Sequence, residues 1–207
     1  MRISRTLLSV LLVLSVIGGL SLYRFYFLKT PASVKVDLHP QGRSKGEASA
    51  VVKIVEYTDF ECPACATANG LMDELFTRFP GKIFLEHKHF PLPRHTHARR
   101  ASVYAECAAE QGKFWPMKDV LFKSQKSWDK MTTVDTYFSE LAVSLGLDGT
   151  RLAACVNSVA AIGKVNRDLA EGKTLTVNST PTFFVNGQRV IGGPLMVQEV
   201  EKILGKK

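Results

Sequence analysis

Two cysteines separated by two residues are the feature of this sequence best suited to chemistry. They are Cys62 and Cys65 in the stretch FECPACATANG, and Pro63 follows the first of them. A pair at this spacing can bind a metal ion, close a short loop as a disulfide, or exchange electrons with other thiols. Residue type alone does not decide among these uses, so the surrounding elements must.

The pair lies at a predicted junction between a strand and a helix. The β-branched run Val51–Tyr57 is typical of a buried strand. Pro63 can begin a helix without losing a hydrogen bond, and apolar residues continue at helical spacing to Phe79. Cys62 then comes at the helix start, where free N–H groups and the helix dipole favour an anion. We predict Cys62 as the attacking thiolate and Cys65, one turn deeper, as the resolving thiol.

The rest of the chain continues this α/β order. Residues 82–90 predict a second strand, and residues 97–172 are helical in pattern. Residues 181–193 predict a hairpin around Asn186-Gly187, a strong turn signal. Residues 194–204 predict a final amphipathic helix.

The other uses of the pair are less consistent with the sequence. A structural zinc site needs four ligands. Cys107 and Cys155 lie far apart in segments with a helical pattern, so they supply no second ligand pair. A bridge across two residues restricts little of the unfolded chain. A Cu(I) site remains an alternative. A C-x-x-C motif next to a predicted strand and helix, however, is typical of redox proteins.

Four histidines, at positions 87, 89, 95 and 97, gather in the stretch EHKHFPLPRHTHARR. A metal site there is an alternative. Because neither carboxylate ligands nor site geometry can be recognised, we interpret these histidines as solvated or substrate-facing residues near the active-site rim, and we predict no metal.

The net charge of +8 does not indicate nucleic-acid binding. Residues 1–35 carry five basic residues and no acidic one, which leaves 22 basic against 19 acidic residues in the remainder. Apart from the His/Arg-rich residues 87–100, no basic block of nucleic-acid type is present there, and we predict no nucleic-acid partner.

The N-terminus predicts a membrane anchor. A basic start precedes 18 uncharged residues, Thr6–Tyr23, which as a helix would reach ~27 Å, close to the ~30 Å of a bilayer's hydrocarbon core. A cleaved signal peptide is the alternative, but no A-x-A-like site follows and residues 23–27 resemble an aromatic belt. We predict residues 1–29 as an uncleaved anchor and the polar residues 30–50 as a linker. Either way, the remainder meets an oxidising compartment.

Four stretches together resemble the DsbA-type (DsbA/BdbD-like) thiol:disulfide oxidoreductases of the thioredoxin superfamily: EYTDFECPACA, HFPLPRHTHARRAS, CAAEQGKFWPMKDVLF and STPTFFVNGQRVIGG. The resemblance implies a thioredoxin fold over residues 51–205 with a helical insertion at about 97–172. It implies a cis bond between Thr180 and Pro181 beside the cysteines, where the Thr180 backbone can pair with an extended peptide. Glu56 stands where the family has a buried acid and could take protons from Cys65; a strand-end glutamate facing water is the alternative.

The resemblance also permits a structural disulfide between Cys107 and Cys155 within the helical insertion. In an oxidising compartment we predict that this disulfide forms. Two buried free thiols are the alternative.

The predicted function is protein disulfide oxidation outside the cytoplasm. We expect a bacterial inner-membrane protein with a periplasmic catalytic domain, exported cysteine-containing clients, and a DsbB- or VKOR-like membrane partner that reoxidises the site; no cofactor is expected. Ala64 stands where the strongly oxidising members carry histidine. A disulfide reductase or isomerase using the same site is the first alternative, and a Cu(I)-binding or chaperone module is the alternative from another class.

Overall fold

The computed structural model describes residues 42–205, together with residues 15, 18 and 19. The contacts within it divide the chain into Met1–Ser33 and Val34–Lys207, and the fold described below belongs to the second unit. The predicted anchor, residues 1–29, lies outside the described residues apart from those three positions. Within the part of the chain that the structure describes, no helix has both the length and the apolar character that a membrane span requires.

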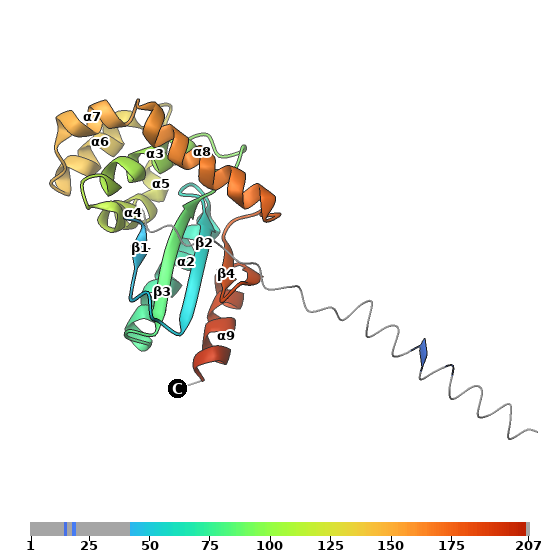
Figure 1. Ribbon diagram of the computed structural model, residues 1–207. Coiled ribbons are helices and arrows are strands. Elements are labelled where there is room, and N and C mark those ends of the chain that lie inside the picture. Colours follow the sequence, from blue (N-terminus) through green and yellow to red (C-terminus); the bar gives the residue numbers. More distant parts are fainter. Residues whose placement is uncertain (1–14, 16–17, 20–41, 206–207) are drawn as a thin grey trace, which may run out of the picture. The chain divides into compact units, whose positions relative to one another are not determined.

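A five-stranded sheet forms the centre of the fold, with the strand order β1-β3-β2-β4-β5 (Figure 1). The strands are β1 (Ser44–Lys45), β2 (Val52–Thr58), β3 (Ile83–His89), β4 (Thr182–Val185) and β5 (Gln188–Ile191). β2 and β3 run parallel, and the other neighbouring pairs are antiparallel. Every residue of β3, and every residue of β2 except Lys53, is buried, as expected of strands that are covered on both faces.

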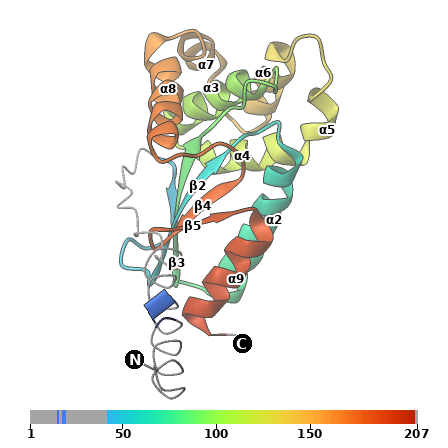
Figure 2. The ribbon, with the colours of Figure 1, turned by 90° about the vertical axis from the view of Figure 1, so that its right-hand side faces the viewer.

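Helices cover both faces of this sheet. α2 (Pro63–Arg78) and α9 (Gly193–Leu204) lie side by side on one face (Figure 2) and share a core with alternate residues of β2, β3 and β4. On the other face, α8 (Val159–Thr174) packs against Tyr57, Phe90 and Phe184. The approach of α8 is close, because a Cβ at Gly172 would lie 2.7 Å from the Phe90 ring.

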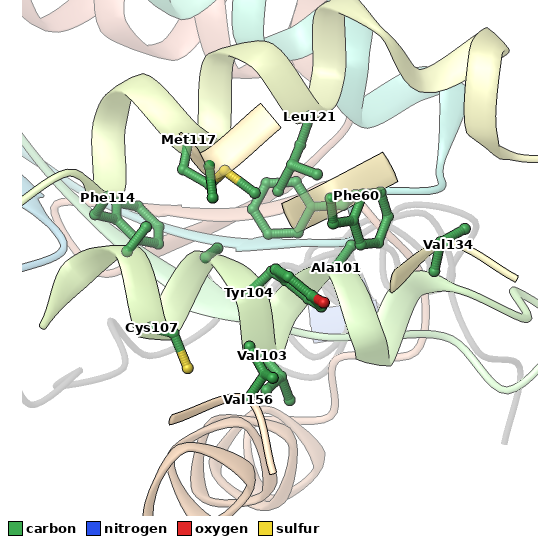
Figure 3. Close-up of a cluster of buried hydrophobic side chains, with 14 of the residues drawn as sticks. Phe60, Ala101, Val103, Tyr104, Cys107, Phe114, Met117, Leu121, Val134 and Val156 are labelled. Atoms are coloured by element: carbon green, nitrogen blue, oxygen red, sulfur yellow. The ribbon is translucent and has the colours of Figure 1, made fainter. Parts of the chain in front are cut away.

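The helical insertion lies between β3 and β4, as predicted. Besides α8 it contains α3 (Ala98–Ala109), α4 (Phe114–Lys123), α5 (Gln125–Trp128), α6 (Asp135–Ser144) and α7 (Gly149–Cys155). Its side chains form a separate core (Figure 3), and this core includes Phe60 from the loop before α2 together with Met117 and Leu121 of α4. The insertion therefore packs directly against the segment that carries the cysteine pair.

The predicted strands and helices outside the insertion agree with the structure to within two residues. β1 lies inside the segment predicted as a linker and was not predicted as a strand. Two residues are too few to show an alternating pattern. β1 depends on tertiary contacts: Ser44 pairs with Glu86, and the Trp115 indole donates to the Ser44 carbonyl at 3.1 Å. Gly46 follows at φ +93°, where a Cβ would lie 2.1 Å from the Ile83 oxygen.

A buried arginine fastens this N-terminal strand to the insertion. Arg43 is 2% exposed, forms an ion pair with Glu106 of α3 at 2.9 Å, and forms a second, hydrogen-bonded pair with Asp168 of α8. The carboxylate of Asp168 also accepts from the backbone N–H of His89, at 2.9 Å. One charge cluster thus joins β1, β3 and two helices of the insertion.

Candidate active site

Cys62 lies at the N-cap position of α2, and Pro63 begins the helix. Its backbone is extended (φ −79°, ψ 120°), and its carbonyl accepts from the N–H groups of Cys65 and Ala66 at 3.0 and 3.2 Å. The Cys62 thiol lies 3.4 Å from the carbonyl oxygen of Thr180, to which it can donate. The structure thus places the sulfur where the sequence predicts it, at the first turn of the helix.

Hydrogen bonds at this helix start lower the pKa of Cys62 from 9.0 to about 5. The largest contribution comes from the Cys65 thiol, which donates to the Cys62 thiolate, while burial opposes the shift. Thr180 and the backbone N–H groups of Cys65 and Ala64 stabilise the thiolate further. At pH 7 a thiol with this pKa is ionised in a ratio of roughly 100 to 1.

Cys65 has the opposite character. It is fully buried, and burial, the hydrogen bond to Cys62 and the negative charge on Cys62 raise its pKa well above 9.0. Thr58 and the Asp59 backbone partly oppose this shift. Both cysteines are free thiols in this structure. The pair therefore consists of one thiolate and one retained proton, which is the reduced state of a thiol-exchange couple.

The loop before β4 completes the site. The Thr180–Pro181 bond is cis, Thr180 is 9% exposed, and the Pro181 carbonyl accepts from Gly192 N–H at 2.9 Å. The hydroxyl of Thr180 is buried and has no other hydrogen-bond partner among the described residues, so it can donate to the Cys62 thiolate. The cis bond that the resemblance implies thus lies beside Cys62.

Residues 59–62, which we call the nucleophile loop, are held by a buried carboxylate that the sequence analysis missed. The Oδ1 atom of Asp59 accepts from Glu61 N–H at 2.7 Å; its Oδ2 atom accepts from Leu92 N–H at 2.7 Å and also lies 2.8 Å from Nδ1 of His95. The turn is closed by Cys62 N–H, which donates to the Asp59 carbonyl at 3.1 Å. An aspartate directly after a buried strand was the available sequence signal.

A second residue that the sequence analysis missed reaches the same loop from the insertion. Gln125, at the start of α5, donates its side-chain amide to the carbonyl oxygens of Phe60 at 2.7 Å and Cys62 at 3.0 Å. Nothing in its sequence context distinguishes it from other polar residues of a helical stretch, because the contact spans more than 60 positions.

Glu56 is fully buried, which excludes the alternative of a strand-end residue facing water. Its carboxylate lies 3.0 Å from the Lys118 ammonium of α4 and 4.0 Å from the ring of His87. Thr58 lies on the same face of β2, and its side chain partly opposes the rise in the pKa of Cys65. The ion pair to Lys118 accounts for the burial of the acid.

The interpretation of the histidines as rim residues is wrong for His87 and His89. Both side chains are fully buried, because β3 is covered on both faces. His87 stacks on Phe60, with ring centroids 5.5 Å apart, and burial keeps its pKa well below 6.5. His89 lies 2.9 Å from the carboxylate of Glu106. No group of three metal-ligating side chains is arranged to hold an ion within the described part of the chain.

Cys107 of α3 and Cys155 of α7 are joined by a disulfide within the insertion, with an S–S distance of 2.03 Å and a Cα–Cα distance of 5.7 Å. This bridge ties two helices of the insertion to each other. The predicted disulfide is therefore present in this structure, and the alternative of two free thiols is not.

This arrangement of strands, helices and cysteines can be compared with known protein families. A family model described as thioredoxin matches residues 39–206. The chain belongs to the thioredoxin family. That match begins before β1 and ends after α9, so it includes every strand and helix described above.

Several solved structures share this fold. BdbD from Bacillus subtilis is 21% identical, with a TM-score of 0.70 over 83% of this chain and 98% of that one. Wolbachia pipientis alpha-DsbA1 is 20% identical, with a TM-score of 0.69 over 79% and 91%. MdbA from Corynebacterium diphtheriae, a thiol-disulfide oxidoreductase, is 22% identical, with a TM-score of 0.65 over 87% and 98%. The resemblance to DsbA-type proteins is confirmed at the level of the fold.

Curated relatives carry a different name. A Na(+)/H(+) antiporter NhaA of Herminiimonas arsenicoxydans is 36% identical over 165 residues, which is 80% of this chain and 25% of that protein. NhaA 1 of Mycobacterium sp. (strain KMS) is 36% identical over 146 residues, or 70% and 23%. This chain therefore spans about a quarter of the length of these relatives.

Proposed function

We propose that this protein is a thiol:disulfide oxidoreductase that oxidises cysteine pairs of exported proteins through Cys62 and Cys65. The observation that carries the proposal is the opposite ionisation of the two thiols at the start of α2, with the pKa of Cys62 lowered to about 5 and that of Cys65 raised. A structural bridge or a chaperone surface would need neither shift.

The reaction begins from the oxidised pair. A client thiolate attacks the Cys62 sulfur, the Cys62–Cys65 bond breaks, and Cys65 leaves and takes up a proton. The second client thiolate then attacks the client sulfur of the mixed disulfide, and Cys62 leaves as a thiolate. The client loses two electrons and two protons. Cys65 keeps one proton, and because Cys62 stays ionised at pH 7, the other proton goes to solvent.

The stabilised thiolate makes Cys62 a good leaving group and favours the reduced state of the pair. A pKa of about 5 instead of 9.0 stabilises the reduced form at pH 7 by roughly 2.7 kcal/mol, since each pKa unit below pH 7 is worth about 1.36 kcal/mol. For a two-electron couple this corresponds to roughly 60 mV toward the oxidising side. A shift of the potential toward the oxidising side supports the transfer of electrons from the client to this protein.

Thr180 fits the role of a client-binding residue. Its backbone lies beside Cys62, next to the cis bond, where an extended client peptide could pair with it. Pro63 and Ala64, which follow Cys62 at the start of α2, are exposed, while Cys62 itself is 5% exposed.

The proposal includes the setting of the protein. Residues 1–29 anchor it in the inner membrane, a linker follows, and the catalytic domain of residues 51–205 lies in the periplasm, where a DsbB- or VKOR-like membrane partner reoxidises it. The exported setting rests on the sequence pattern of the N-terminus. Fractionation of cells should recover the full chain with membranes, and a soluble form beginning near residue 30 would instead show a cleaved signal peptide.

The deciding measurement is the reduction potential of the Cys62–Cys65 couple, obtained by equilibrating the protein with glutathione buffers. We expect a value clearly more oxidising than the ~−270 mV of thioredoxin, together with an oxidised pair in cells. A value near that of thioredoxin, with the pair reduced in cells, would favour the reductase. Efficient reshuffling of a scrambled substrate would favour the isomerase.

A further inference from the structure

The helical insertion reaches the nucleophile loop through the side chain of Gln125. The amide nitrogen donates to the carbonyl oxygens of Phe60 at 2.7 Å and of Cys62 at 3.0 Å, and the residue is 6% exposed. A primary amide has two N–H donors, so the side chain gives both of them to this loop.

We propose that Gln125 is a positioning residue for the chemistry of Cys62: its amide holds the nucleophile loop in the turn that presents the Cys62 sulfur to the start of α2 and to Thr180. Gln125 acts through the loop and touches no reacting atom. The proposal deepens the proposed function, because it rests on Cys62 being the reactive thiol.

The Phe60 carbonyl depends most on this donor, because the Cys62 carbonyl also accepts from the N–H groups of Cys65 and Ala66. Phe60 is fully buried, and a buried carbonyl that loses its donor costs about 1–3 kcal/mol. The loop could recover that cost only by turning the Phe60 carbonyl toward water. Such a turn would move Cys62, whose extended backbone sets the direction of its sulfur at the N-cap.

Gln125 is itself held by the core of the insertion. Trp128, in the same short helix, is fully buried, donates its indole N–H to the Leu121 carbonyl at 3.0 Å, and packs edge-on against Phe138 with ring centroids 5.1 Å apart. Asp59 holds the loop from the opposite end through Glu61 and Leu92. The loop is therefore clamped from both ends by groups that are buried in the fold.

Loss of the amide should make the Cys62 thiolate less stable, because the N–H groups of Ala64 and Cys65 would be less well aligned with the sulfur. This change raises the pKa of Cys62 and makes the couple more reducing. A carboxylate in place of the amide would face two carbonyl oxygens and add negative charge. It should therefore raise the pKa of Cys62 more than loss of the amide alone.

The test uses the reduced full-length chain with Gln125→Leu, Gln125→Glu and Gln125→Asn. Gln111→Leu is the matched control, because Gln111 also bonds a backbone, that of Asp148, within the insertion. The pKa of Cys62 is read from the ultraviolet absorbance of the thiolate against pH. We expect a rise of about one unit in Gln125→Leu, a larger rise in Gln125→Glu, a smaller one in Gln125→Asn, and no change in the control.

The glutathione equilibrium provides the second readout. The couple should become roughly tenfold easier to oxidise for each unit by which the Cys62 pKa rises, as long as Cys62 remains ionised at the assay pH. If Gln125→Leu lowers the melting temperature but leaves both the Cys62 pKa and the potential unchanged, Gln125 is merely structural and the proposal is wrong.

A measurement on the unmodified protein avoids dependence on folding of the variants. The side-chain amide NMR signals of Gln125 should shift with pH around the Cys62 pKa, while those of Gln111 should not, and a Gln125 signal without this inflection would contradict the proposal. The outcome is independent of the direction of electron flow: a thioredoxin-like potential would overturn the oxidase function and leave the Gln125 effect intact.

Discussion

Cys62 and Cys65 are chemically identical side chains one helical turn apart, yet they differ strongly in proton affinity. Cys62 receives hydrogen bonds at the helix start, whereas Cys65 lies deeper and loses contact with solvent. The difference therefore arises from position. It allows one sulfur to enter and leave mixed disulfides while the other retains a proton.

Alkylation of the reduced protein by iodoacetamide should show this difference directly. The thiolate is the reactive species and the pKa of Cys62 is about 5, so the rate should be nearly constant above about pH 6 and fall about tenfold per pH unit below pH 5. Mass spectrometry should locate the adduct on Cys62, and Cys62→Ala should abolish the fast reaction. A rate that keeps rising to pH 9 would show an ordinary thiol.

The assignment of roles predicts which cysteine traps clients. In Cys65→Ala the mixed disulfide at Cys62 cannot be resolved from within the protein, so client adducts should accumulate on non-reducing gels. Cys62→Ala is the control and should give none. If only Cys62→Ala traps clients, the attacking and resolving roles are reversed.

At the scale of elements, the insertion is bonded to the thioredoxin part by buried polar contacts as well as by packing. Lys118 of α4 pairs with Glu56 of β2, Arg43 pairs with α3 and α8, and Gln125 of α5 holds the nucleophile loop. Each contact joins elements far apart in the sequence, so the two parts depend on each other for their local geometry.

The Glu56–Lys118 pair gives a test of this dependence. Glu56→Leu leaves a buried ammonium without its partner and should lower the free energy of unfolding by about 3 kcal/mol. Adding Lys118→Met should restore most of the loss, because two apolar residues of similar volume then replace the ion pair. Urea denaturation measures both.

An exposed pair serves as the comparison for this experiment. Lys202→Met removes the partner of Glu199 on the surface of α9 and should change the free energy of unfolding by less than about 1 kcal/mol. If the double variant at Glu56 and Lys118 is as unstable as Glu56→Leu, then removal of the acid, rather than the unpaired charge, accounts for the loss.

Local pattern explains which elements could be predicted from the sequence. β2 is a β-branched run, and α2 has helical periodicity and a proline at its start, so their limits and the place of Cys62 follow from the residues themselves. β1 is too short to have a pattern. The burial of His87 depends on helices that close over both faces of the sheet, which periodicity along one strand does not reveal.

At the scale of the whole molecule, contacts between distant segments complete the site. The pairing of β2 with β4 and the contact of Thr180 with Cys62 could be expected only through the resemblance to DsbA-type proteins, because each joins positions more than 100 residues apart. The hydrogen bonds from Gln125 were not predictable even in that way. Helix and strand patterns therefore indicated the position of the thiols but not all of the groups that surround them.

The disulfide of the insertion should stabilise the fold without taking part in exchange. It joins positions 48 residues apart, and closing a loop of that length contributes up to about 4 kcal/mol by restricting the unfolded chain. The double variant Cys107→Ala/Cys155→Ala should lose stability up to that amount in urea denaturation. Its alkylation profile at Cys62 should match that of the unchanged protein. A shifted profile would show that the bridge also influences the active site.

The contacts of Cys62 with Gln125 and Thr180 also bear on how the protein is made. Thr180 lies 118 positions after Cys62 and Gln125 lies 63 positions after it, so a ribosome completes Cys62 long before either partner. Until the chain has been synthesised and folded, Cys62 has no helix start, no amide clamp and no threonine beside it, and it has the weak acidity of an ordinary cysteine. The reactive thiol is thus a product of folding. A newly synthesised chain therefore carries at position 62 a mostly protonated thiol, which forms mixed disulfides more slowly than the thiolate of the folded site.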